Sequence, residues 1–81
     1  METKLSIISI IIEDIKKVDQ VNQILHENPI YTIGRLGVPY HKKNICVLSI
    51  VLDCPPDFLS SLSGKLGMLE GVSVKSMSSK I

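Results

Sequence analysis

Two segments of the chain, residues 5–12 (LSIISIII) and 44–53 (NICVLSIVLD), are strand-like and apolar at both alternating positions. In the first segment one face would carry Ile8, Ile10 and Ile12, and the other Leu5, Ile7 and Ile11, interrupted by Ser9. In the second, one face would carry Cys46, Leu48, Ile50 and Leu52, and the other Ile45, Val47 and Val51, interrupted by Ser49. A strand with one face in water should alternate apolar and polar residues. The pattern therefore predicts two strands that are covered on both faces.

The other elements follow from helical periodicity and from turn residues. After a first strand over residues 4–12, Asp14 can cap a helix over residues 15–26. Its expected apolar stripe comprises Ile15, Val18, Val21, Ile24 and Leu25. His26 falls in the last turn, where a cation is favoured by the helix dipole, and it is expected on the surface. Asn28–Pro29 should end this helix.

A weaker strand is expected over residues 30–39, because Gly34 and Gly37 interrupt it. Interior glycines mark bulges or close approaches, and Pro39 favours the edge of a sheet. Residues 40–43 connect this strand to the next, and Pro55–Pro56 ends the third strand. A second helix over residues 57–66 should use Gly64 for close packing. Gly71 should turn the chain into a last strand over residues 72–77.

The resulting order is β-α-β-β-α-β within a single domain, residues 1–81. Right-handed crossovers around a central hairpin predict an α+β, ferredoxin-like fold, with a four-stranded antiparallel sheet and both helices on one face. The two doubly apolar strands then lie in the middle, so their second face has no cover within one chain. A homo-oligomer, a dimer or tetramer, is predicted through this face, which comprises Leu5, Ile7, Ser9, Ile11, Ile45, Val47, Ser49 and Val51.

Composition and charge narrow the function classes. The chain is 44% hydrophobic and 21% charged with a net charge of +1, which is typical of a globular domain. Its lysines are scattered, so no direct nucleic-acid contact and no membrane association are expected. The first apolar run is followed by Glu13 and Asp14 and is shorter than the ~20 residues of a membrane span.

The two cysteines are expected to be reduced thiols in the cytoplasm. Cys46 and Cys54 are eight positions apart, which is roughly 26 Å along an extended strand. A disulfide needs Cα atoms within about 7 Å. Reduced thiols fit a reducing compartment.

Several chemistries found on this topology are disfavoured. The central strands lack the aromatic residues that an RNA-binding sheet stacks on bases. Glu13 and Asp14 would repel a phosphate after the first strand. His26 and His41 are the candidate bases for a cysteine nucleophile, but no recognisable motif joins them to Cys46 or Cys54. The chain is therefore expected not to be an enzyme.

Three segments carry a family resemblance: GRLGVPY at residues 34–40, NICVLSIVLD, and LSGKLGMLEGVSVKS at residues 62–76. Together with the opening strand and helix, they resemble a family of small stand-alone ACT-like domains described as regulators of the iron-only hydrogenase system. The resemblance covers nearly the whole chain. It implies a ferredoxin-like fold, a homo-oligomer and, as partners, a small-molecule effector or a protein of the hydrogenase system.

ACT domains bind small effectors near the turn after the first strand and the neighbouring second strand. By this resemblance the candidate ligand-binding residues are Glu13, Asp14, Arg35, Gly37 and Tyr40. A carboxylate could be held by the planar fork of Arg35, and an amine by Glu13 or Asp14. The alternative is that Asp14 is a helix cap and Arg35 is solvated. The turn lacks the glycine or proline of amino-acid-binding ACT domains, and no cofactor can be named.

A more distant resemblance is to the metal-sensing domain of nickel-responsive repressors. His41 and Cys46 stand where that domain has metal ligands. A square-planar nickel site needs four ligands, so two chains would have to contribute two each. The alternative is a loop histidine and a core cysteine.

The sequence therefore predicts a regulatory or effector-binding module of the hydrogenase system that acts without its own DNA-binding segment. The two alternatives are a structural protein–protein adaptor and a metal sensor that uses His41 and Cys46.

Overall fold

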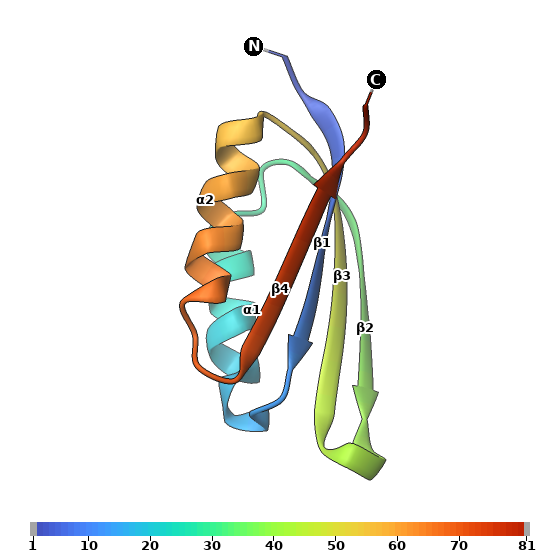
Figure 1. Ribbon diagram of the computed structural model, residues 1–81, viewed down its shortest axis with the longest axis vertical. Coiled ribbons are helices and arrows are strands. Elements are labelled where there is room, and N and C mark those ends of the chain that lie inside the picture. The colour runs from blue at the N-terminus through green and yellow to red at the C-terminus, as the bar shows by residue number, and fades with distance from the viewer. Residues whose placement is uncertain (1, 81) are drawn as a thin grey trace.

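The computed structural model describes residues 2–80 and confirms the predicted order of elements (Figure 1). The chain forms β1 (Lys4–Ile12), a 3₁₀ turn η1 (Ile15–Lys17), α1 (Val18–Glu27), β2 (Thr32–Tyr40), a second 3₁₀ turn η2 (His41–Lys43), β3 (Ile45–Cys54), α2 (Pro56–Gly67) and β4 (Val72–Ser78). The two helices fall within two or three residues of their predicted ends, except that α1 begins only after η1. No helix in residues 2–80 has the length and hydropathy that crossing a bilayer requires.

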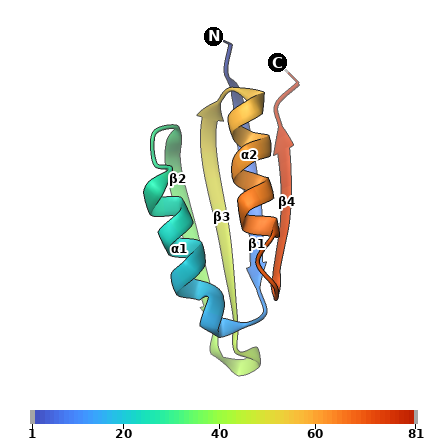
Figure 2. The ribbon, with the colours of Figure 1, turned by 90° about the vertical axis from the view of Figure 1, so that its left-hand side faces the viewer.

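The four strands form one antiparallel sheet in the order β2-β3-β1-β4. The two doubly apolar strands, β1 and β3, are central, as the sequence predicts. Both helices lie on the same side of the sheet, and the described chain puts no element on the other side (Figures 1 and 2). We call these two sides the helix face and the outer face. The predicted α+β ferredoxin-like fold is therefore confirmed.

The core lies between the helices and the helix face of the sheet. Burial alternates along β1 and β3, and the buried side chains are the ones that face the helices. The cluster comprises Ile8, Ile10, Ile12, Leu48, Ile50, Leu52 and Cys54 from the sheet and Val21, Leu25, Leu59, Leu62 and Leu66 from the helices. The prediction that Ile15 belongs to the apolar stripe of the first helix is wrong. Ile15 lies in η1, before the helix, and is 41% exposed.

A bulge in β2 decides which way its side chains point. The register with β3 shifts between Thr32 and Gly34, so Ile33 is an extra residue. Side chains alternate along a strand, and one extra residue exchanges the faces of everything after it. Arg35 therefore lies opposite the buried Ile50, on the helix face. Leu36, Val38 and Tyr40 lie on the outer face.

Two glycines differ in what they do. Gly71 has φ +79°, and its carbonyl accepts hydrogen bonds from the backbone N–H groups of Glu13 (2.8 Å) and Asp14 (3.3 Å). It thus turns the chain into β4, as predicted, and holds the end of β1. Gly64 was expected to permit close packing, but nothing lies within 4 Å of the position its Cβ would take. That expectation is wrong, because Gly64 is on the exposed side of α2.

Candidate functional site

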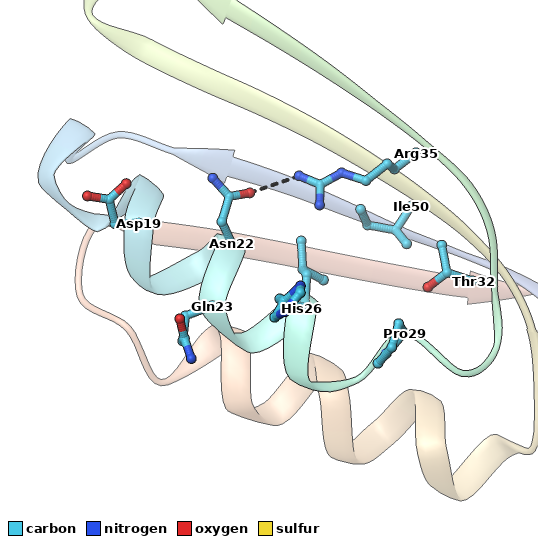
Figure 3. Close-up of a pocket in the computed structure, with 9 residues that line it drawn as sticks. Asp19, Asn22, Gln23, His26, Pro29, Thr32, Arg35 and Ile50 are labelled. Atoms are coloured by element: carbon cyan, nitrogen blue, oxygen red, sulfur yellow. Dashed lines mark hydrogen bonds between the residues drawn. The ribbon is translucent and has the colours of Figure 1, made fainter.

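A groove of about 630 Å³ runs between α1 and the edge strand β2 (Figure 3). On the helix it is lined by Asp19, Asn22, Gln23 and His26, which are spaced to share one helix face. The opposite side carries Pro29, Thr32 and Arg35. Leu25 and Ile50, both core residues, form its floor. The groove thus joins polar walls to an apolar base.

Local hydrogen bonds fix the turn η1 that leads into α1 and the C-terminal end of α1. At the start of η1, an Asp14 carboxylate oxygen accepts from the Lys16 backbone N–H at 3.1 Å. At the end, the Asn28 side chain donates to the carbonyl of Ile24 at 2.7 Å, and its backbone N–H donates to the Leu25 carbonyl. These contacts satisfy groups that a helix terminus leaves unpaired. They also set the position of the groove-lining face relative to β2.

The guanidinium of Arg35 crosses the groove to the helix. Its Nη2 donates to Oδ1 of Asn22 at 2.8 Å, across the gap between β2 and α1 (Figure 3). Asn22 is partly buried, whereas Arg35 is exposed. Arg35 is thus exposed to solvent, as the alternative interpretation held, and it also has a hydrogen-bond partner on another element. The partner is a neutral amide, so the arginine charge has no counter-ion there.

The structure separates the acidic candidates from Arg35. Glu13 accepts from the Ser73 hydroxyl at 3.4 Å, and Asp14 caps η1, so both lie near the β1–β4 pair. Arg35 lies on β2, at the opposite edge of the sheet. Among the hydrogen bonds of residues 2–80, none joins either acid to this arginine. One chain therefore does not bring these three residues to a common site.

The remaining ligand candidates lie on opposite faces of β2. Gly37 is on the helix face opposite Leu48, and a Cβ there would come within 3.0 Å of the Leu48 Cδ2 atom. Close packing against the core thus explains why this position has no side chain. Tyr40 is on the outer face, paired with Ile45, and is 46% exposed.

His41 and Cys46 also differ in environment. His41 is exposed in η2, whereas Cys46 is partly buried at the start of β3 and packs against the core. No group of three or more histidine, cysteine or acidic side chains within residues 2–80 is arranged to hold a metal ion. A site that uses His41 and Cys46 would still need ligands from a second chain, as the sequence implied.

The two cysteines are free thiols, as predicted. Cys54 is 1% exposed in the core. Burial raises the pKa of its thiol, and the neighbouring Asp53 adds to this, while a hydrogen bond with Ser6 opposes it. Because the thiolate is the nucleophilic form, a raised pKa makes Cys54 inert.

We expect a thiol reagent such as DTNB to modify Cys46 of the folded protein at least tenfold faster than Cys54. Cys54 is both inaccessible and held as the thiol, whereas Cys46 is partly exposed. Peptide mass spectrometry at pH 8 would measure the two rates, and a Cys46→Ser variant should retain only the slow one. In urea the rates should converge. Equal rates in the folded state would contradict this assignment.

The same pKa direction sets a pH dependence of stability. The folded state holds the Cys54 proton more tightly than the unfolded chain does. The stabilising contribution of this thiol is therefore complete below the ordinary thiol pKa of about 8.5 and is lost as the pH rises beyond it.

The second candidate surface is the outer face of the sheet. All eight predicted interface residues lie on it, with Ser9 directly opposite Ser49, Ile7 opposite Val51 and Ile11 opposite Val47. Several keep a large exposed fraction in the single chain: Leu5 52%, Ile7 37%, Ile11 44% and Val47 39%. The bulge in β2 adds Leu36 at 64% and Val38 at 47%, and β4 adds Met77 at 68%. The surface is therefore wider than the sequence indicated.

The groove residues Asp19, Asn22 and Thr32 were not identified from the sequence. Their proximity to Arg35 depends on how α1 packs over the sheet edge, and no local pattern reports that. The alternation of Leu36, Val38 and Tyr40 was a usable signal for the outer face, although Gly34, which precedes these residues, interrupted the pattern.

Comparison with known proteins identifies the family. The family model named TM1266-like, with the description "Iron-only hydrogenase system regulator, putative", matches residues 4–76. The chain belongs to the TM1266-like family. The solved structure of the uncharacterized protein TM1266 from Thermotoga maritima is similar to it, with a TM-score of 0.92 and 36% identity over 98% of this chain and 100% of that one. The resemblance inferred from the residues is thereby confirmed.

More distant structures share the fold with this member of the TM1266-like family. The C-terminal domain of the MgtC protein from Mycobacterium tuberculosis has a TM-score of 0.71 and 18% identity over 96% of this chain and 89% of that domain. A formyltetrahydrofolate deformylase from Pseudomonas putida KT2440 has a TM-score of 0.65 and 13% identity over 90% of this chain and 28% of that one. At these identities the likeness concerns the ACT-like fold alone. No curated protein matches the chain.

Proposed function

We propose that this chain is a non-enzymatic, homo-oligomeric regulatory module of the iron-only hydrogenase system, assembled through the outer face of its sheet. The family description supports the system, and the uncovered outer face supports the assembly. In water, exposed patches of this kind usually mark interaction sites.

The central observation is the arrangement of side chains across the outer face. Rows of apolar residues on either side flank a central row in which Ser9 and Ser49 are paired. Two such sheets can pack face to face at about 10 Å, and small residues in the middle permit close approach. Each large aliphatic side chain that becomes fully buried contributes up to about 1.5–3 kcal/mol. Several of them together approach the whole stability of a typical domain.

Sedimentation analysis at low micromolar concentration tests the assembly. We expect the wild type to sediment as a dimer or tetramer. Val47→Asp should shift it to monomer, because a carboxylate would be buried opposite Ile11 without a partner. Leu36→Asp is the second variant, for use if Val47→Asp does not fold, because β2 is an edge strand and tolerates substitution better. It should weaken association at least tenfold.

Ser60→Asp is the matched control, since it adds the same charge at an exposed position of α2 on the helix side. It should leave the assembly unchanged. A folded wild type that remains a monomer, with circular dichroism of a complete fold, would overturn the proposed interface.

The link to the hydrogenase system needs a test in cells. In a host that has an iron-only hydrogenase, deletion of this protein should alter hydrogenase activity, and the wild-type chain should restore it. The Leu36→Asp variant should restore it poorly if assembly is required. Unchanged activity in the deletion strain would contradict the regulatory role.

A structural adaptor is the second candidate, because the same apolar face could dock a hydrogenase-system protein. In that case the isolated chain would be monomeric, and Val47→Asp would abolish binding of the purified partner. The sedimentation experiment therefore separates the two functions.

A further inference from the structure

We propose that the groove between α1 and β2 binds a small monocarboxylic acid, with Arg35 as its carboxylate anchor. The inference deepens the proposed function, on which it rests for its regulatory meaning, by giving the chemical class of an effector. It uses one chain alone and does not require the outer-face interface.

Arg35 is held in place by one hydrogen bond and keeps further donors for a ligand. A guanidinium carries five N–H donors in a planar fork, and the hydrogen bond to Asn22 uses one of them. None of the side-chain hydrogen bonds within residues 2–80 connects it to an acidic group. The remaining donors face an open groove, and a carboxylate matches their spacing through two parallel hydrogen bonds.

The bulge at Ile33 is what aims Arg35 at the groove. If Ile33 paired regularly with Val51, the Arg35 side chain would lie opposite Ser49 on the outer face, among aliphatic residues. With Ile33 in a bulge, Arg35 lies on the helix face, opposite Ile50, and reaches Asn22 on α1. Bulges often re-aim a side chain beside a functional site. A merely solvated arginine would need neither the bulge nor the bond to Asn22.

The charges of the groove favour one negative charge on the ligand. Asp19 lies one helical turn before Asn22 and lines the same groove (Figure 3). Its carboxylate would repel a second negative charge, so a dianionic phosphate is a poorer fit than a monocarboxylate. Thr32 and His26 offer further hydrogen-bonding groups near Arg35.

The floor and the volume of the groove indicate what the part of the ligand beyond its carboxylate can be. Leu25 and Ile50 are 8% and 1% exposed, and both line the groove. Because so little of either side chain is exposed, a small uncharged body would lie above them, between the groove walls, while its carboxylate meets Arg35. The volume of about 630 Å³ is within the usual range of about 300–1,000 Å³ for small-molecule sites. It leaves room for a ring or a short alkyl chain.

Titration of the labelled protein with benzoate and pentanoate, followed by two-dimensional NMR, tests the inference. We expect saturable shifts at the backbone amides of Asn22, His26, Thr32 and Arg35. Inorganic phosphate and pentylamine should bind at least tenfold more weakly. Arg35→Gln should weaken carboxylate binding at least tenfold, whereas Arg35→Lys should retain part of it, because an ammonium keeps the charge but loses the fork.

Lys65→Gln is the matched control, since it removes one positive charge from the exposed side of α2, away from the groove. It should bind both acids as the wild type does. The inference is overturned if neither acid shifts the groove amides, if phosphate binds more tightly than both, or if Arg35→Gln binds unchanged.

Sedimentation of Arg35→Gln separates this inference from the proposed function. The variant should assemble as the wild type does, because Arg35 is not on the outer face. Failure of carboxylate binding with an intact oligomer would reject the ligand class alone.

Discussion

Gly71→Ala is expected to destabilise the fold by about 2–5 kcal/mol, from left-handed backbone strain and overpacking together. The backbone at Gly71 has φ +79°, which residues with a Cβ rarely adopt. A Cβ there would also lie 2.7 Å from the Asp14 Cβ. Asp14 cannot move away freely, because its backbone N–H donates to the Gly71 carbonyl. Urea unfolding monitored by circular dichroism would measure the loss.

The matched control for this substitution is Gly64→Ala in α2. Nothing lies within 4 Å of the position of its Cβ, and alanine is the better helix former. We therefore expect a gain of about 0.5–1 kcal/mol. Equal unfolding midpoints for the two variants would show that the turn into β4 is not constrained as described.

The second large effect is expected for Ile10→Ala, which should cost about 2–5 kcal/mol. Ile10 is fully buried in the core, so truncating its side chain leaves a cavity among packed side chains. Its neighbour Ile11 points to the outer face and is 44% exposed in the single chain. Ile11→Ala in the monomer should cost less than about half as much.

Comparing these two adjacent positions also reports on assembly. The loss caused by Ile10→Ala should not depend on protein concentration. The loss caused by Ile11→Ala should grow with concentration, because binding between copies adds to apparent stability. Unfolding curves at two protein concentrations would measure this. A concentration-independent loss for Ile11→Ala would speak against its place in an interface.

The sequence predicted the fold well because the signals in β1 and β3 are local and strong. Alternating positions of two long apolar strands set both faces, and Pro39 and Gly71 marked an edge and a turn that the structure contains. The helix beginning was predicted too early, since Ile15 matched the periodicity but lies in a 3₁₀ turn.

The candidate site was less accessible to sequence reasoning. Arg35 was named as a candidate by the ACT resemblance, with its planar fork as the chemical reason, but its partner Asn22 is 13 positions earlier on another element. Glu13 and Asp14 follow the central strand β1, yet their hydrogen bonds go to the side of β4. Which residues meet Arg35 depends on the bulge and on helix packing, which are tertiary properties.

The extra residue in β2 links the two candidate surfaces through the length of one strand. If Ile33 instead paired regularly with Val51, every later side chain of β2 would change sides. Arg35 would then lie opposite Ser49 among the aliphatic residues of the outer face, while Leu36 and Val38 would face the helices. A slip of one position in the pairing of this strand would therefore abolish ligand capture and self-association at once, although neither Arg35 nor Leu36 is mutated.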